Sequence, residues 1–156
     1  MKCRLIAAGT RLPDWINTGF SDYQRRLRSP LALELEEITV ARRSAGDNPA
    51  AAVQREGADM MAAIRPGDYV VALEVKGKSL DTPGLAAWLA DRMRDGRPLA
   101  LLIGGPDGLA PPCRERADQA WSLSPLTLPH GLARVVVAEQ IYRAMSLLGG
   151  HPYHRA

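Results

Sequence analysis

Two hydrophobic spacings alternate along this chain. Short apolar runs, which are typical of buried strands, occur at residues 5–8, 69–75, 99–103 and 120–123. Between them lie segments in which apolar residues recur every three or four positions, as on one face of a helix. Strands that are apolar throughout are typical of parallel sheets covered by helices. The pattern therefore predicts an α/β fold with a mostly parallel sheet flanked by helices.

Residues that favour helix starts and stops bound the helical segments. The first segment begins at Pro13 and carries Ile16, Phe20, Tyr23 and Leu27 on one face. We expect further helices from Pro49, capped by Asp47 or Asn48, from the Thr82-Pro83 cap and first turn, and over about 132–148. A period of two over residues 31–36 predicts a half-exposed strand near a sheet edge.

The length and composition are those of one folded domain. The chain has 156 residues, of which 46% are hydrophobic and 24% charged, so we expect a single domain over 1–156 and exclude a disordered chain. No apolar stretch approaches the roughly 20 residues that span a bilayer, and the apolar run among the first residues is too short for a signal peptide. We therefore expect a soluble cytoplasmic protein without a membrane partner.

A net charge of +3 permits RNA binding without indicating it. Arg25, Arg26 and Arg28 lie mainly off the apolar face of the first helix, and Arg42 and Arg43 follow the second predicted strand. Cations at a helix end also complement the helix dipole. From the sequence alone, that structural interpretation is preferred to contact with RNA phosphates.

Two loops could line a ligand site. Gly104 to Gly108 directly follows the apolar strand 99–103, where consecutive glycines let backbone amides approach a ligand. The loop lacks the spacing of the nucleotide-binding fingerprints, and taken alone it is better explained as a tight turn that requires a positive φ. The segment from Leu123 to His130 contains two prolines, which suit either a stiff pocket wall or a simple connector.

The last 27 residues contain all three histidines, His130, His151 and His154. Tyr153 and Arg155 accompany them, so groups that titrate, stack on bases and bind phosphate are concentrated here. A frayed terminus is the alternative. No carboxylate or cysteine stands at ligand spacing, which disfavours a metal site.

Five segments taken together resemble a known family. They are residues 8–15, 102–109, 126–130, 139–144 and 151–154, in the same order over essentially the whole chain. They are similar to the RlmH family of the SPOUT superfamily, which are pseudouridine N3-methyltransferases of large-subunit ribosomal RNA. The resemblance implies a homodimer whose C-terminal part forms a deep trefoil knot. It further implies that the knot binds S-adenosylmethionine (SAM).

The resemblance also assigns site residues. Those implied to bind SAM are Leu73, Gly104, Gly105, Leu123, Ser124, Pro125, Leu126, Thr127 and Leu128. The implied substrate is a pseudouridine in helix 69 of 23S ribosomal RNA within the assembled 70S ribosome, and no metal is required. A SPOUT enzyme acting on another RNA, such as tRNA, and a non-catalytic ribosome-associated module are the two alternatives.

The catalytic hypothesis places the C-terminal tail in the active site. Tyr153 would stack on the extruded base, Arg155 would meet phosphate or the ring anion, and His154 or His130 would assist loss of the N3 proton. Arg143 is a further candidate, although Glu139 at i−4 offers it a structural ion pair. Arg25, Arg26 and Arg28 are the hypothetical RNA-phosphate contacts.

Overall fold

The computed structural model describes residues 1–40, 44–46, 48–155. Within these residues, five strands form one sheet in the order β2-β1-β4-β3-β5, and every neighbouring pair is parallel. The strands are β1 (Lys2–Ala8), β2 (Ala32–Ile38), β3 (Tyr69–Ser79), β4 (Leu99–Ile103) and β5 (Gln119–Ser122). The predicted α/β class with a parallel sheet is confirmed, and β2 lies at the sheet edge as its period of two predicted.

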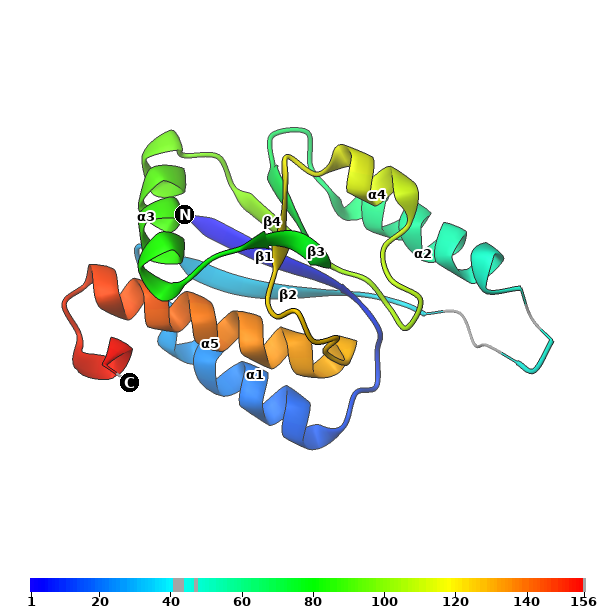
Figure 1. The fold of residues 1–156 in the computed structure, drawn as a ribbon, viewed down its shortest axis with the longest axis horizontal. Helices are drawn as coiled ribbons and strands as arrows, with labels where there is room; N and C mark the ends of the chain where they lie inside the picture. Colours follow the sequence, from blue (N-terminus) through cyan, green and yellow to red (C-terminus); the bar gives the residue numbers. More distant parts are fainter. Residues whose placement is uncertain (41–43, 47, 156) are drawn as a thin grey trace.

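Helices cover both faces of the sheet (Figure 1). One face carries α1 (Asp14–Arg26), α3 (Thr82–Asp95) and α5 (His130–Leu148), and the other carries α2 (Pro49–Ala63) and α4 (Pro111–Arg116). A short 3-10 helix, η1 (Pro152–His154), follows α5. Alternate residues of β1 enter the two cores: Leu5 packs toward α1 and α5, and Ile6 toward α2 and α4.

The helix boundaries agree with the predicted ones except in four places. Asp81, whose side chain accepts a hydrogen bond from the Gly84 amide, caps α3 in place of Thr82. The last helix begins at His130, two residues before the predicted Leu132. Helix α4 and the 3-10 turn η1 were not predicted. The cap of α2 is Asn48, whereas Asp47 lies outside the described residues.

Strand β3 is longer than the predicted 69–75 and is interrupted. It pairs with β5 up to Leu73 and again from Lys78, with a register shift between these positions. Val70 to Ala72 are buried as predicted, but Val75 is exposed. A Cβ on Gly77 would lie 2.4 Å from the Trp121 backbone carbon. Only glycine therefore allows the chain to return to β5 after the interruption.

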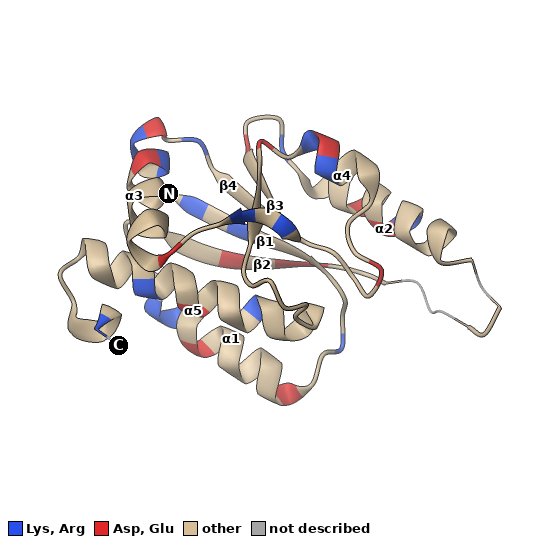
Figure 2. Ribbon diagram, in the orientation of Figure 1, with Lys and Arg blue, Asp and Glu red and all other residues tan. Residues whose placement is uncertain are grey.

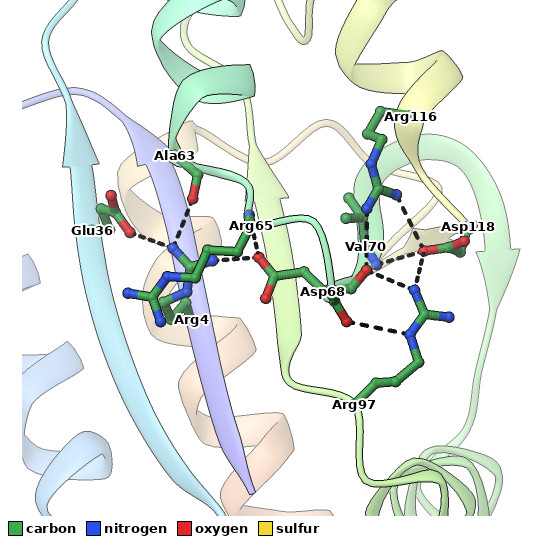
Figure 3. Close-up of polar contacts among 10 residues, drawn as sticks. Arg4, Glu36, Ala63, Arg65, Asp68, Val70, Arg97, Arg116 and Asp118 are labelled. Carbon is green, nitrogen blue, oxygen red and sulfur yellow. Dashed lines mark hydrogen bonds and ion pairs between the residues drawn. The ribbon is translucent and has the colours of Figure 1, made fainter.

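The amino edge of the sheet is closed by charged groups (Figure 3). Arg4 is 3% exposed and Asp68 is 1% exposed, and they form an ion pair in the interior. Arg4 also donates to Glu36 at 2.7 Å and to the Ala63 carbonyl at 2.9 Å. These contacts join β1, β2 and the segment before β3.

No helix among the described residues is long and apolar enough to cross a membrane. The two cysteines, Cys3 and Cys113, are both free and buried. Burial raises the pKa of the Cys3 thiol to about 12, and it also raises the pKa of Cys113. Both thiols are therefore protonated at neutral pH and behave as small apolar residues.

Candidate active site

A cavity of about 900 Å³ lies at the carboxyl edge of the sheet. It is lined by the interrupted part of β3, the β4–α4 loop, the β5–α5 loop and the first turn of α5. Its size suits a small organic ligand, and open parallel sheets bind ligands beyond the carboxyl ends of their strands. The lining residues are 73–76, 103–106, 108–109, 114, 123–124, 126–130 and 133.

The residues expected to bind SAM gather at this cavity, with one exception. Leu73, Gly104 and Gly105 line it, as do Leu123, Ser124, Leu126, Thr127 and Leu128. Pro125 is exposed and does not line the cavity. The Ser124 hydroxyl accepts a hydrogen bond from the Leu126 amide at 2.9 Å, which closes a turn around Pro125. Pro125 therefore stiffens the turn from its outer side.

The β4–α4 loop needs its glycines. The Gly108 amide donates to the Gly105 carbonyl at 3.0 Å, and Gly108 adopts a positive φ of 82°. A Cβ on Gly104 would lie 2.4 Å from the Gly108 carbonyl carbon, which belongs to the backbone and cannot move aside. The loop thus keeps a narrow shape in which backbone groups face the cavity.

His130 is placed at the cavity by the start of α5. It is half-buried, and a Cβ on Gly9 would lie 3.1 Å from the His130 ring. Arg134, one turn later, is 1% exposed and donates to the Gly9 carbonyl at 2.6 Å and to Glu37 at 3.0 Å. Arg134 therefore ties the loop after β1 to the helix that carries His130. No local motif in the sequence points to Arg134.

Three charged side chains line the cavity rim. Glu74 and Lys76 come from the interruption in β3, and Arg114 comes from α4. Arg114 forms an ion pair with Glu74 across the gap between the two elements. Among the described residues, no group of three His, Cys, Asp or Glu side chains could hold a metal ion.

The other predicted catalytic residues lie at the far end of α5. This helix has 19 residues, which corresponds to a length of about 28 Å. His130 begins it at the cavity, whereas Arg143, Tyr153, His154 and Arg155 lie near or after its end (Figure 1). The structure therefore does not bring the five predicted residues together within one chain.

Tyr153 is held by α1 and α5. Its hydroxyl donates to Glu139 at 3.1 Å and lies 3.2 Å from the Tyr23 hydroxyl, and its ring packs on Tyr142 with the centroids 4.7 Å apart. Burial, followed by the hydrogen bond with Tyr23, raises the Tyr153 pKa. Tyr153 is thus a neutral phenol at neutral pH.

The expected ion pair between Arg143 and Glu139 is present, with an N–O distance of 2.6 Å. The hydrogen bond to Glu139 raises the Arg143 pKa, and the guanidinium also lies over the Tyr153 ring. His154 Nδ1 contacts the His151 carbonyl at 2.5 Å, and Arg155 is exposed. The tail thus forms the short 3-10 turn η1, which packs against α5 of the same chain.

The three predicted RNA-contacting arginines are exposed at the end of α1. Arg26 pairs with Asp22 at 2.7 Å, while Arg25 and Arg28 donate to backbone carbonyls of their own turn. Figure 2 shows basic residues spread over several helices and interspersed with acidic ones. Arg42 and Arg43 lie outside the described residues.

Two comparisons with known proteins concern the sequence. A family model described as predicted SPOUT methyltransferase matches residues 1–154. Ribosomal RNA large subunit methyltransferase H from Alkalilimnicola ehrlichii is 55% identical over 157 residues, covering all of both chains.

One comparison concerns the fold. A solved structure from Neisseria gonorrhoeae, described as belonging to a methylase family, superimposes with a TM-score of 0.54 at 15% identity. The match covers 90% of this chain and 81% of that one, and at this identity it supports the fold alone. The family model and the relative decide the family, because each spans nearly the whole chain. The chain belongs to the SPOUT methyltransferase family.

Proposed function

We propose that this protein transfers a methyl group from SAM to N3 of a pseudouridine in helix 69 of 23S ribosomal RNA, on the assembled 70S ribosome. The observation that carries the proposal is the cavity at the carboxyl edge, lined by nearly all the residues expected to bind the methyl donor. The 55% identity to a large-subunit ribosomal RNA methyltransferase supports the class of substrate.

The cavity fits SAM in size and in chemistry. A volume of about 900 Å³ accommodates a ligand of this size. Leu73, Leu123 and Leu128 offer apolar surface to an adenine ring, and the Gly104–Gly105 segment brings backbone groups to the wall without a Cβ in the way. Neutral polar atoms of adenosine are well satisfied by such backbone donors and acceptors.

When bound, SAM would supply the methyl group from its cationic sulfonium, and the neutral thioether S-adenosylhomocysteine would be the leaving group. The N3 proton must also leave, which requires a base or a group that stabilises the ring anion. His130 is the candidate already at the cavity. The raised pKa of Tyr153 leaves almost no phenolate at neutral pH, so Tyr153 is a poor candidate for the base. The remaining task of the chain is to align the two reactants and exclude water.

The tail reaches a cavity most directly in a homodimer. Within one chain, α5 separates Tyr153, His154 and Arg155 from the cavity by its whole length. A second copy packed antiparallel to it would bring one tail to the other cavity. Each active site would then combine His130 of one subunit with His154 and Arg155 of its partner, and Tyr153 would stack on the extruded base once released from Tyr142.

Deleting residues 151–156 tests this arrangement. We expect methyl transfer to be lost while SAM affinity stays within about twofold, because none of the residues that line the cavity of this chain belongs to the tail. Mixing this truncated protein with a Gly104→Ala variant provides the control. Mixed dimers combine one intact cavity with one intact tail, so partial activity should return. Unchanged turnover in the truncated protein, or no recovery on mixing, would contradict the composite site.

Recognition of the RNA would use the surface of the dimer. Arg28 is exposed and donates to the Arg25 carbonyl, and Arg25 is exposed with a backbone hydrogen bond and only a long contact to Asp22 at 3.9 Å, so both remain able to meet phosphates. Arg26 is partly neutralised by Asp22 and is expected to contribute less. Each contact is weak alone, and several add through counterion release.

The substrate is tested with methyl-labelled SAM and three RNA sources. We expect label in 23S RNA from 70S ribosomes, little in separated subunits and none in bulk tRNA. Label in tRNA instead would favour a SPOUT enzyme of another specificity. Failure of SAM to bind in calorimetry would favour a non-catalytic module.

A further inference from the structure

An ion pair spans two separate elements at the rim of the cavity. Glu74 follows Leu73 at the point where β3 leaves its pairing with β5, and Arg114 belongs to the short helix α4. The Arg114 Nε donates to Glu74 Oε1. Both residues line the cavity, so a cation and an anion stand side by side at its rim.

The stability of the fold does not explain this ion pair. The Arg114 side chain is 50% exposed and the Glu74 side chain 24% exposed. Pairs with this much access to water contribute little to stability. The rest of the lining is mainly aliphatic, glycine or proline, apart from Lys76, His130, Ser124 and Thr127. Two opposite charges at the rim of such a cavity point to a ligand that itself carries two opposite charges.

SAM, the methyl donor of the proposed function, carries two opposite charges at one of its ends. The adenosine part of SAM is neutral and fits an apolar wall with backbone donors, whereas its amino-acid end carries an α-carboxylate and an α-ammonium. A planar guanidinium matches a carboxylate through paired hydrogen bonds, and a carboxylate suits an ammonium.

We propose that Glu74 and Arg114 form the subsite for the amino-acid end of SAM. Arg114 binds the ligand carboxylate, and Glu74 binds the ligand ammonium. The ion pair that the two residues make with each other is exchanged for two pairs with the ligand. This assignment rests on the proposed function, because it presupposes that the cavity holds SAM.

The surroundings of Arg114 agree with this role. A Cβ on Gly108 would lie 3.5 Å from an Arg114 guanidinium nitrogen, so the guanidinium sits against the glycine turn that shapes the cavity wall. Glu74 is adjacent in sequence to Leu73, which lines the cavity on the strand side. The charged subsite is thus continuous with the wall proposed to hold adenosine.

Three ligands separate this subsite from a merely structural ion pair. S-Adenosylhomocysteine carries both charges, decarboxylated SAM carries the ammonium without the carboxylate, and 5′-methylthioadenosine carries neither. Each is titrated by calorimetry into the wild-type protein, Arg114→Gln and Glu74→Gln. Lys78→Gln is the matched control, since Lys78 is an exposed cation on the same strand that does not line the cavity.

Arg114→Gln should weaken S-adenosylhomocysteine by about tenfold or more, the scale of one charge-assisted contact. Its affinity for decarboxylated SAM and for 5′-methylthioadenosine should stay within about twofold. Glu74→Gln should weaken decarboxylated SAM several-fold and leave 5′-methylthioadenosine unchanged. Lys78→Gln should match the wild type with all three ligands.

Two results would overturn the subsite and leave the proposed function standing. Equal weakening of all three ligands would mean that the pair only supports the cavity wall. Unchanged affinity for S-adenosylhomocysteine in both variants would mean that the amino-acid end lies elsewhere. If the wild-type protein bound none of the ligands, the proposed function would fail and this assignment with it.

Discussion

At the amino edge of the sheet, charged side chains fill the space between strand ends, whereas at the carboxyl edge backbone groups and apolar side chains surround a cavity. Around Asp68, the side chain binds Arg4 and the Arg65 amide, and the Asp68 carbonyl accepts from Arg97 and Arg116 (Figure 3). Around the cavity, glycines and prolines define the wall.

The two edges of this small sheet therefore serve different purposes, one the stability of the fold and the other the binding of a ligand. At the amino edge, Arg4 and Asp68 bind each other and neighbouring groups in the interior, which joins the strand ends. At the carboxyl edge, the loops leave a space that a ligand of suitable shape can fill. We therefore expect substitutions at the amino edge to change the free energy of unfolding, and substitutions at the carboxyl edge to change affinity for SAM.

The largest effect is expected for Asp68→Asn. Asp68→Asn removes the buried counter-charge of Arg4 and leaves it only the partly exposed Glu36, and we expect a loss of roughly 3 to 5 kcal/mol in the free energy of unfolding. Urea denaturation measures it. Arg94→Gln removes a partner from the exposed pair with Asp91 and should cost under about 1 kcal/mol. Equal losses in the two variants would contradict the distinct role of the buried network.

The next effect is expected for Gly104→Ala. The added Cβ meets the Gly108 backbone, so the loop must shift, and we expect SAM affinity to fall by about ten- to hundredfold. Gly67→Ala is the control, because Gly67 lies at the amino edge and a Cβ there meets nothing within 4 Å. Calorimetry on both variants measures the effect. Undiminished affinity in Gly104→Ala would contradict the role of this loop.

The smallest effect concerns the tail, which docks at the end of α5 away from the cavity. Because the Tyr153 pKa is raised by burial and by its hydrogen bond with Tyr23, the neutral phenol is favoured by docking. Docking should persist through the usual tyrosine range near about pH 10. It should weaken only as the pH rises through the raised pKa of Tyr153. Absorbance titration of the wild type and Tyr153→Phe measures this. If Tyr153 instead ionises at the lowest pH among the four tyrosines of the chain, the docking of the tail on α1 and α5 is contradicted.

Much of the fold could be predicted because its signals are local. The apolar run 99–103 coincides with β4, and the spacing of Ile16 and Phe20 gave the buried face of α1. Helix α4 was missed because its six residues bury only Cys113, which is too little for a periodic pattern. The interruption in β3 was missed because it depends on contact between Gly77 and Trp121, 44 positions apart in the chain.

The candidate site could be predicted only in part, for a related physical reason. Family motifs located the glycine loop and the 123–128 segment, both of which lie at the cavity apart from Pro125. Glu74, Arg114 and Arg134 act across elements and have no local motif. The catalytic hypothesis grouped His130 with the tail by residue type, although the helix predicted over about 132–148 already separates them, and the structure begins that helix at His130 itself. The knot implied by the family stays an expectation.

The central claim is that the cavity at the carboxyl edge serves methyl transfer to ribosomal RNA. Its most direct test is mass spectrometry of the helix 69 fragment of 23S RNA from cells with the gene, without it, and with Gly104→Ala in its place. The account predicts one methyl group on a pseudouridine that disappears without the gene and is strongly reduced in the variant. Unchanged methylation of that fragment in cells lacking the gene would contradict it.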